Sequence, residues 1–185
     1  SIIIPTFNRS RLIGATLRSV LDQTGGNFEV IVVDDGSTDD TLATLEPYRS
    51  RVKIIQQTNS GPGAARARGA SDASGQYVAF LDSDDLWLPW SLATYQQAIQ
   101  RFKSPAVILG TPIFFTEEQE IQHVKRDPFV AQVHADFLAT SDRFTWFSGS
   151  SIIIRKDVLD AAGGVTTARI NADDFDLLLR VGSAS

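Results

Sequence analysis

The chain contains no cysteine and no methionine, and its histidines are limited to His123 and His134. The absence of cysteine excludes disulfides, thiolate metal sites and a cysteine nucleophile. With so little histidine, any bound metal would depend on oxygen ligands, which favours Mg²⁺ or Mn²⁺. No apolar run approaches the roughly 20 residues that a membrane-spanning helix needs, so the sequence predicts no transmembrane segment.

Strong charge is also lacking. The 185 residues carry a formal net charge of −5, with 43% hydrophobic and 21% charged residues. This composition is typical of a folded globular chain, and the length predicts a single domain. A mildly acidic chain is a poor candidate for nucleic-acid binding, so we expect partners of another kind.

Short apolar runs alternate with helical periodicity through the first half of the chain. Continuous apolar strands that alternate with helices predict a mainly parallel α/β sheet with helices on both faces. The predicted strands are 1–4 (ended by Pro5), 28–33, 52–55, 77–81, 107–109, 113–115 and 152–154. The predicted helices are 11–21, 39–46, 64–73, 89–102, 128–138, 157–162 and 173–181.

Polar residues follow three strands of the first half, at 5–8, 34–37 and 82–85. In open α/β sheets, ligands bind beyond the carboxyl ends of the strands. All three polar sets should meet at this edge, and their coincidence indicates a binding site there.

The densest set contains Asp82, Asp84 and Asp85. Carboxylates this close repel one another unless a cation or a hydrogen-bond network offsets their charge. A divalent metal held by one or two carboxylates and substrate phosphates would offset it. The alternative is a solvated turn that caps the next helix.

Two further sets have a functional and a structural interpretation. A carboxylate at Asp34 or Asp35 could accept a hydrogen bond from a base or a ribose, or the segment could simply begin a helix capped by Ser37 or Thr38. The glycine loop 61–63 opens a helix that could bind phosphate. The loop does not match the G-x-G-x-x-G motif of dinucleotide-binding folds. It follows the third strand instead of the first, and Arg66 stands where that motif has its third glycine. Its arginines could instead lie on a solvated helix face.

Acids recur at Asp173 and Asp174, where the last predicted helix begins. Acidic residues are favoured at a helix N-terminus, so a structural role is one interpretation. The other is a general base that removes a proton from a hydroxyl.

Together these motifs resemble family 2 glycosyltransferases. The similar segments, in the order of the family, are 1–9, 30–39, 61–69, 80–85, 149–164 and 173–177. The resemblance implies a GT-A fold in one catalytic domain over 1–185, with a nucleotide-sugar half (1–105) and an acceptor half (106–185). We expect the end of the acceptor half to lie beyond this sequence.

The resemblance also implies an inverting transfer from a nucleoside-diphosphate sugar, with a UDP-sugar favoured. The acceptor would be a saccharide or lipid-linked hydroxyl in cell-envelope polysaccharide or glycolipid synthesis. We expect a cytoplasmic domain that can associate peripherally with the inner face of the cell membrane. The oligomeric state is left open.

Roles of individual residues follow from the same resemblance. Asp35 would contact the base, Asp82 the ribose, and Asp84 a Mn²⁺ or Mg²⁺ ion bound through the diphosphate. Asp174 would be the general base, with Asp173 beside it, where the family often has Glu. The implied nucleotide-sugar site comprises Pro5, Thr6, Phe7, Asn8, Asp35, Gly61, Arg66, Asp82 and Ser83.

Three alternatives remain at this point. A sugar-1-phosphate nucleotidylyltransferase would need a glycine-rich basic loop directly after the first strand, where this chain has Pro5 to Arg9. A degenerate or truncated nucleotide-sugar-binding module would typically lack Asp84 or Asp174, and both are present. A response-regulator receiver fits the strand ends poorly.

Overall fold

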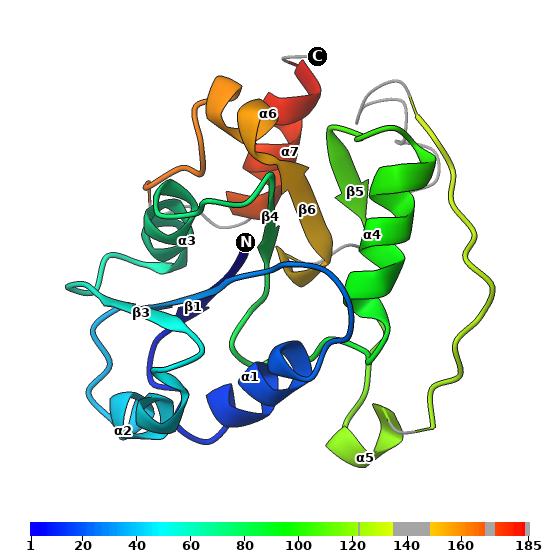
Figure 1. The fold of residues 1–185 in the computed structure, drawn as a ribbon. Helices are drawn as coiled ribbons and strands as arrows, with labels where there is room; N and C mark the ends of the chain where they lie inside the picture. The colour runs from blue at the N-terminus through cyan, green and yellow to red at the C-terminus, as the bar shows by residue number, and fades with distance from the viewer. Residues whose placement is uncertain (122, 135–148, 169–172, 184–185) are drawn as a thin grey trace.

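A computed structural model describes residues 1–121, 123–134, 149–168 and 173–183 (Figure 1). Six strands form one sheet in the order β3-β2-β1-β4-β6-β5. They are β1 (Ile2–Thr6), β2 (Val30–Asp34), β3 (Lys53–Gln56), β4 (Tyr77–Phe80), β5 (Val107–Leu109) and β6 (Ile152–Arg155). β6 runs antiparallel to β4 and β5, while the β1, β2, β3 and β4 pairings are parallel. The prediction of a mainly parallel α/β sheet is confirmed.

Helices cover both faces of the sheet, which explains why β1, β2 and β4 are buried along their whole length. One core contains apolar side chains from α1 (Ile13–Leu21), α2 (Thr41–Leu45) and α4 (Ser91–Arg101). The other contains side chains from α3 (Pro62–Ser71), α6 (Lys156–Ala161) and α7 (Asp173–Ser183). The remaining described elements are η1 (Glu46–Tyr48), α5 (Glu118–Ile121) and η3 (Gly149–Ser151).

Pro5 lies inside β1, paired with Val33, and does not end the strand as predicted. The Ile2 N–H donates to Glu29 beside β2, so alternation along the strand directs the Pro5 nitrogen toward β4. Proline has no N–H to donate, and the β1–β4 pairing covers Ile2 and Ile3 but not Pro5. The two strands therefore separate at the proline.

Two predicted elements in the second half are wrong. Residues 113–115 form no strand, and 128–134 form no helix, while 135–138 lie outside the described residues. The apolar side chains of these segments are largely exposed, with Phe114 at 78% and Val130 at 84%. Their apolar pattern does not produce regular structure, because most of these side chains stay exposed instead of joining a core.

The predicted helix cap at Ser37 or Thr38 is also wrong. Asp40 is the residue before α2, and Asp39 accepts a hydrogen bond from the Thr41 N–H. The hydroxyl of Ser37 instead accepts from the Asn8 N–H, in the loop after β1. Ser37 therefore joins two loops at the carboxyl edge of the sheet.

Candidate functional site

A cavity of about 710 Å³ lies at the carboxyl edge of the parallel strands. Its walls come from the segments after β1, β2, β3 and β4. From β1 the chain builds the sheet outward through β2 to β3, and then crosses back to add β4 on the other side of β1, which makes the β1–β4 boundary the topological switch point of the sheet. Ligands of open α/β sheets bind at such points. The lining residues are Pro5, Thr6, Phe7, Arg9, Asp35, Asn59, Ser60, Gly61, Pro62, Gly63, Ala65, Arg66, Asp82, Ser83, Asp84 and Ala168.

Asp35 holds the loop after β3 against the end of β2. Its Oδ1 accepts hydrogen bonds from the Ser60 N–H and from Gln57 Nε2, and its Oδ2 accepts from the Gly61 N–H, each at 2.8 Å. The carboxylate is almost fully buried, so these donors replace the water that it would otherwise bind. Asp35 therefore has two roles: it lines the cavity, and its hydrogen bonds hold the neighbouring loop in place.

Gly36 allows this loop to approach. Its φ of +79° lies in the left-handed region, and a Cβ there would be 3.0 Å from the Asn59 nitrogen. A side chain would therefore meet backbone atoms that cannot move independently of the loop.

The loop continues into α3, whose first turn faces the cavity. Gly61 precedes the helix with a φ of +93°, and Pro62 occupies its first turn, where a missing N–H costs nothing. Gly63 and Ala65 lie in the cavity wall. The N-terminus of a helix favours negative charge, so the wall suits an anion such as a phosphate.

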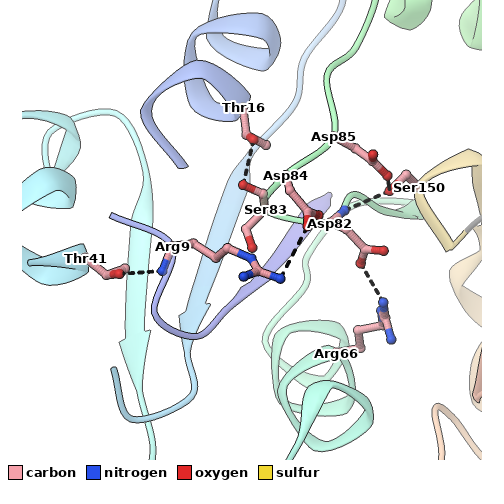
Figure 2. A network of polar contacts seen from close by, with 9 residues as sticks. All are labelled: Arg9, Thr16, Thr41, Arg66, Asp82, Ser83, Asp84, Asp85 and Ser150. Atoms are coloured by element: carbon pink, nitrogen blue, oxygen red, sulfur yellow. Dashed lines mark hydrogen bonds and ion pairs between the residues drawn. The ribbon is translucent and has the colours of Figure 1, made fainter. Parts of the chain in front are cut away.

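Arg66 extends from α3 to the acidic loop after β4. Its Nη2 lies 2.5 Å from Asp82 Oδ1, and its side chain is 10% exposed, against 33% for Asp82 (Figure 2). The expectation of two arginines on a solvated helix face therefore fails for Arg66, which is buried. Arg68, by contrast, lies on the exposed face and pairs with Asp72.

The two other acids of this loop have different partners (Figure 2). Asp84 lies 3.3 Å from Arg9 Nη2, and both side chains are 45% exposed. Asp85 accepts a hydrogen bond from the hydroxyl of Ser150, which also accepts from the Asp82 N–H at 2.9 Å. Burial raises the pKa of Asp85 above its ordinary value; the Ser150 hydrogen bond opposes the shift, and the nearby charges of Asp82 and Asp84 add to it. Arg66, Arg9 and the Ser150 hydroxyl thus offset the negative charge of this loop, for which the sequence had suggested a cation.

A divalent cation still fits Asp84. Its carboxylate is half-exposed on the cavity wall, whereas Asp82 is tied to a buried arginine. Within the described part of the chain, no group of at least three His, Cys, Asp or Glu side chains could hold a metal alone. One carboxylate with phosphate oxygens and water is a common way to hold Mg²⁺, so the residues suit a cation that arrives with a phosphorylated ligand.

Most residues expected at the nucleotide-sugar site lie in this one cavity. They are Pro5, Thr6, Phe7, Asp35, Gly61, Arg66, Asp82 and Ser83, together with the expected metal ligand Asp84. Asn8 is not part of the lining. Its Oδ1 accepts hydrogen bonds from the Thr38 and Asp39 N–H groups, so its side chain joins the loops after β1 and β2.

The expected general base lies in a different element. Asp173 and Asp174 are the first residues of α7, and the positions of their side chains are outside what the structure describes. Ala168, five residues before Asp173, lines the cavity. A chain of this length spans at most about 18 Å, so α7 begins within that distance of the cavity wall.

Sequence reasoning assigned no role to Arg9 or Ser150. Arg9 directly follows the polar set after β1. Its position at the same sheet edge as the acidic strand ends could have predicted an ion pair with one of these acids. Ser150 had no such signal, because its partners lie 65 and 68 residues away in the chain.

Comparison with known proteins agrees with this architecture. An uncharacterized glycosyltransferase of Rickettsia conorii is 47% identical over 89 residues, which are 47% of this chain and 15% of the relative. The enzyme WfgD of Escherichia coli, a UDP-Glc:alpha-D-GlcNAc-diphosphoundecaprenol beta-1,3-glucosyltransferase, is 43% identical over 90 residues, which are 48% of this chain and 36% of WfgD. This chain therefore corresponds to a part of each relative.

A solved structure extends the likeness over the whole chain. S. aureus TarS 1-349 superposes with a TM-score of 0.75 at 27% identity, over 99% of this chain and 55% of TarS 1-349. Its complex with UDP-GlcNAc gives a TM-score of 0.71 at 26% identity, over 98% of this chain and 52% of the TarS chain. The fold is thus the GT-A fold of glycosyltransferases.

Among the helices of the described residues, none is long and apolar enough to cross a membrane. The family model described as Glycosyl transferase family 2 matches residues 1–163, most of the chain. With a cavity at the switch point, acids at the strand ends and this match, the chain belongs to glycosyl transferase family 2.

Proposed function

We propose that this chain is the catalytic domain of an inverting glycosyltransferase that uses a nucleoside-diphosphate sugar, with a UDP-sugar favoured. The observation that carries the proposal is that Asp35, Arg66, Asp82 and Asp84, from three separate segments of the chain, line one shared cavity. A base, a ribose and a diphosphate need these different partners in one place. The acceptor would be a saccharide or lipid-linked hydroxyl in cell-envelope polysaccharide or glycolipid synthesis.

In this proposal the nucleotide lies along the β1–β4 boundary. Asp35 has about four lone-pair positions and uses three of them for protein donors, which leaves one for a base N–H. Pro5 and Phe7 line the same cavity as Asp35, and the side chain of Phe7, a residue that is 43% exposed, would cover the base. Asp82 would bind the ribose with its orientation held by Arg66.

Asp84 would hold Mn²⁺ or Mg²⁺ together with the diphosphate oxygens. When bound, the cation would offset the charge that develops on the diphosphate as it leaves. Ser83 would line the same part of the site, with its carbonyl held by the buried hydroxyl of Thr16 (Figure 2).

The transfer itself would be one in-line displacement. Asp174, or Asp173 beside it, accepts the proton of the acceptor hydroxyl, and the oxygen forms a bond to the anomeric carbon. The bond from that carbon to the diphosphate breaks with its electrons on the diphosphate oxygen, so the configuration inverts. The lining residue Ala168 precedes α7 by five residues in the chain, which supports this assignment.

The relatives support the donor and the cellular role. The name of WfgD specifies UDP-Glc and alpha-D-GlcNAc-diphosphoundecaprenol, and TarS has been solved with UDP-GlcNAc. By analogy we propose a UDP-sugar donor and an acceptor at the inner face of the cell membrane, with peripheral association of the domain.

Calorimetric titration with UDP, GDP, CDP and dTDP, each with and without Mn²⁺, tests the donor class. We expect UDP to bind, and more tightly with Mn²⁺. A folded protein that binds none of the four would favour the remaining alternative, a degenerate module. The nucleotidylyltransferase alternative no longer stands, because the family match decides against it.

Asp84→Ala should remove the gain in UDP affinity that Mn²⁺ produces, because the carboxylate that faces the diphosphate is lost. Titration of UDP at saturating Mn²⁺ measures this gain. A gain equal to that of the parent protein would rule out Asp84 as the metal ligand.

Asp174→Asn should lower the rate of transfer by about 100-fold or more, because an amide cannot accept the proton of the acceptor hydroxyl. UDP affinity should stay unchanged, which separates this role from donor binding. Transfer at the parent rate would exclude Asp174 as the base and direct the test to Asp173.

A further inference from the structure

The acidic loop after β4 holds two ion pairs that differ in environment. Arg66 and Asp82 form a pair that is largely buried, with a separation of 2.5 Å. Arg9 and Asp84 are 3.3 Å apart and half-exposed. Breaking a buried pair leaves an uncompensated charge, whereas an exposed pair contributes little and exchanges partners readily. The Arg9–Asp84 pair is thus the exchangeable one.

Arg9 is fixed at its backbone but not at its charged end. Its N–H donates to the hydroxyl of Thr41 at 2.9 Å (Figure 2). That hydroxyl in turn donates to Asp39. Arg9 stands three residues after the end of β1, and it lines the same cavity as the N-terminus of α3. A long side chain anchored there can reach more than one negative group on the cavity wall.

Asp84 has the simplest surroundings of the three acids. Across the described residues, Arg9 is the partner that the structure gives it, while Asp82 and Asp85 are both connected to the Ser150 hydroxyl. A cation that binds Asp84 would repel the guanidinium of Arg9 and displace it. Arg9 would then lie beside the diphosphate that accompanies the cation.

We infer that Arg9 is a transferable counter-ion, which pairs with Asp84 and moves to the diphosphate when a cation engages Asp84. Arg9 is thus a donor-binding residue whose availability depends on Asp84. This inference rests on the proposed function, because it needs a diphosphate donor and a cation at Asp84. It adds that cation binding and diphosphate binding are coupled through one arginine.

The test is a double-mutant cycle on metal-free UDP affinity, measured in EDTA at low ionic strength. The proteins are the parent, Asp84→Asn, Arg9→Gln and the double variant. Asp84→Asn releases Arg9, so UDP should bind about threefold or more tightly than to the parent, since a charge-assisted contact is gained and a repulsion lost. With Arg9→Gln also present, most of this gain should disappear.

The sign of the coupling separates this inference from simple screening. If Arg9 merely screened Asp84, removal of Asp84 would help UDP more in the Arg9→Gln background than in the parent. That result, or no tightening in Asp84→Asn, would overturn the inference. Detectable binding by Asp84→Asn where the parent shows none would support it.

Controls separate this outcome from a failure of the proposed function. Arg68→Gln removes an exposed arginine on α3 that pairs with Asp72 outside the cavity, and it should leave UDP affinity within about twofold. Titrations of the parent with UDP and Mn²⁺ test the function itself. If the parent binds UDP with Mn²⁺ but the cycle has the wrong sign, the inference fails alone; if no protein binds UDP under either condition, both fail.

Discussion

The acids at the carboxyl edge of the sheet differ by their partners more than by their positions. Asp35 is held by backbone amides, Asp82 by a buried arginine, Asp84 by an exposed one and Asp85 by a serine hydroxyl. Each partner restricts what its acid can do. A carboxylate with several protein donors keeps its place, whereas one with a weak exposed partner remains available to a ligand.

The role of Asp35 gives a prediction at this scale. Asp35→Asn places an amide N–H where the carboxylate accepts from Gly61 or from Ser60 and Gln57, so at least one hydrogen bond is lost. We expect a loss of about 1–3 kcal/mol in the free energy of unfolding, together with weaker UDP binding. Urea denaturation measures the first quantity and calorimetry the second.

Asp160→Asn provides the matched control, because Asp160 is exposed and pairs with Lys156 on the surface of α6. Its unfolding free energy should change by less than about 1 kcal/mol. Equal effects of the two substitutions would contradict a framework role for Asp35.

Among the elements, α3 connects the core to the site. Its inner face touches β1 and β2, and its first turn lines the cavity. Gly69 makes this contact close, because a Cβ there would lie 2.3 Å from Ile3 Cγ2 and 3.2 Å from Val33 Cγ2. The position of Arg66 therefore depends on a glycine one turn later in the helix.

Gly69→Ala should displace α3 from the sheet. We expect a loss of about 1–3 kcal/mol in unfolding free energy through overpacking, and weaker UDP binding because Arg66 moves with the helix. Thermal unfolding and UDP titration on the same protein test both effects.

Gly14→Ala in α1 is the comparison. There the nearest atom to a new Cβ is Arg18 Nη1 at 3.4 Å, an ordinary contact. Alanine favours helix by up to about 1 kcal/mol over glycine, so stability should be equal or higher. A similar loss in both variants would show that the close contact at Gly69 is not the cause.

For the molecule as a whole, two apolar cores cover the sheet, and polar contacts close its ends. At the end opposite the cavity, Glu29 Oε1 accepts hydrogen bonds from Ser1 Oγ at 2.6 Å and from the N–H and hydroxyl of Ser74 at 2.7 Å. Although partial burial raises the pKa of Glu29, these hydrogen bonds outweigh it and lower the pKa to about 2. Glu29 thus connects segments that flank β1, β2 and β4.

This contact makes stability depend on pH. A carboxyl whose pKa is lower in the folded state stabilises the fold above its ordinary pKa, and that contribution is lost as the pH falls. For Glu29 the window runs from about 4.5 down to about 2. The parent should therefore lose stability relative to Glu29→Gln in this window, which denaturation at a series of pH values measures; a constant difference between the two proteins would contradict the assignment.

The regular half of the fold was predictable because its signals are local. Apolar runs and helical periodicity identified β1 to β4 and the helices between them, to within a few residues. The errors occurred where a distant contact decides the outcome. Pro5 stays within β1 because β4 separates there, and residues 113–115 form no strand, since Ile113 and Phe114 stay exposed instead of joining a core.

For the candidate site, the location was predictable but the contacts between its side chains were not. Parallel strands bring their carboxyl ends to one edge, so the polar sets after β1, β2 and β4 had to meet. The contacts of the individual side chains were not predictable. Asn8 belongs to a polar set but accepts a hydrogen bond from the loop after β2, whereas Arg9 beside it lines the cavity.

The sequence by itself determined the order of strands and helices in the first half, the acidic strand ends and the family, because each depends on neighbouring residues. Only the tertiary structure decided which charge meets which. Arg9 faces Asp84, Arg66 faces Asp82 and Ser150 joins Asp82 to Asp85, all between separate segments that the fold brings together. The reason is physical: the strength and the exchange of an ion pair depend on distance and burial, and the folded chain sets both.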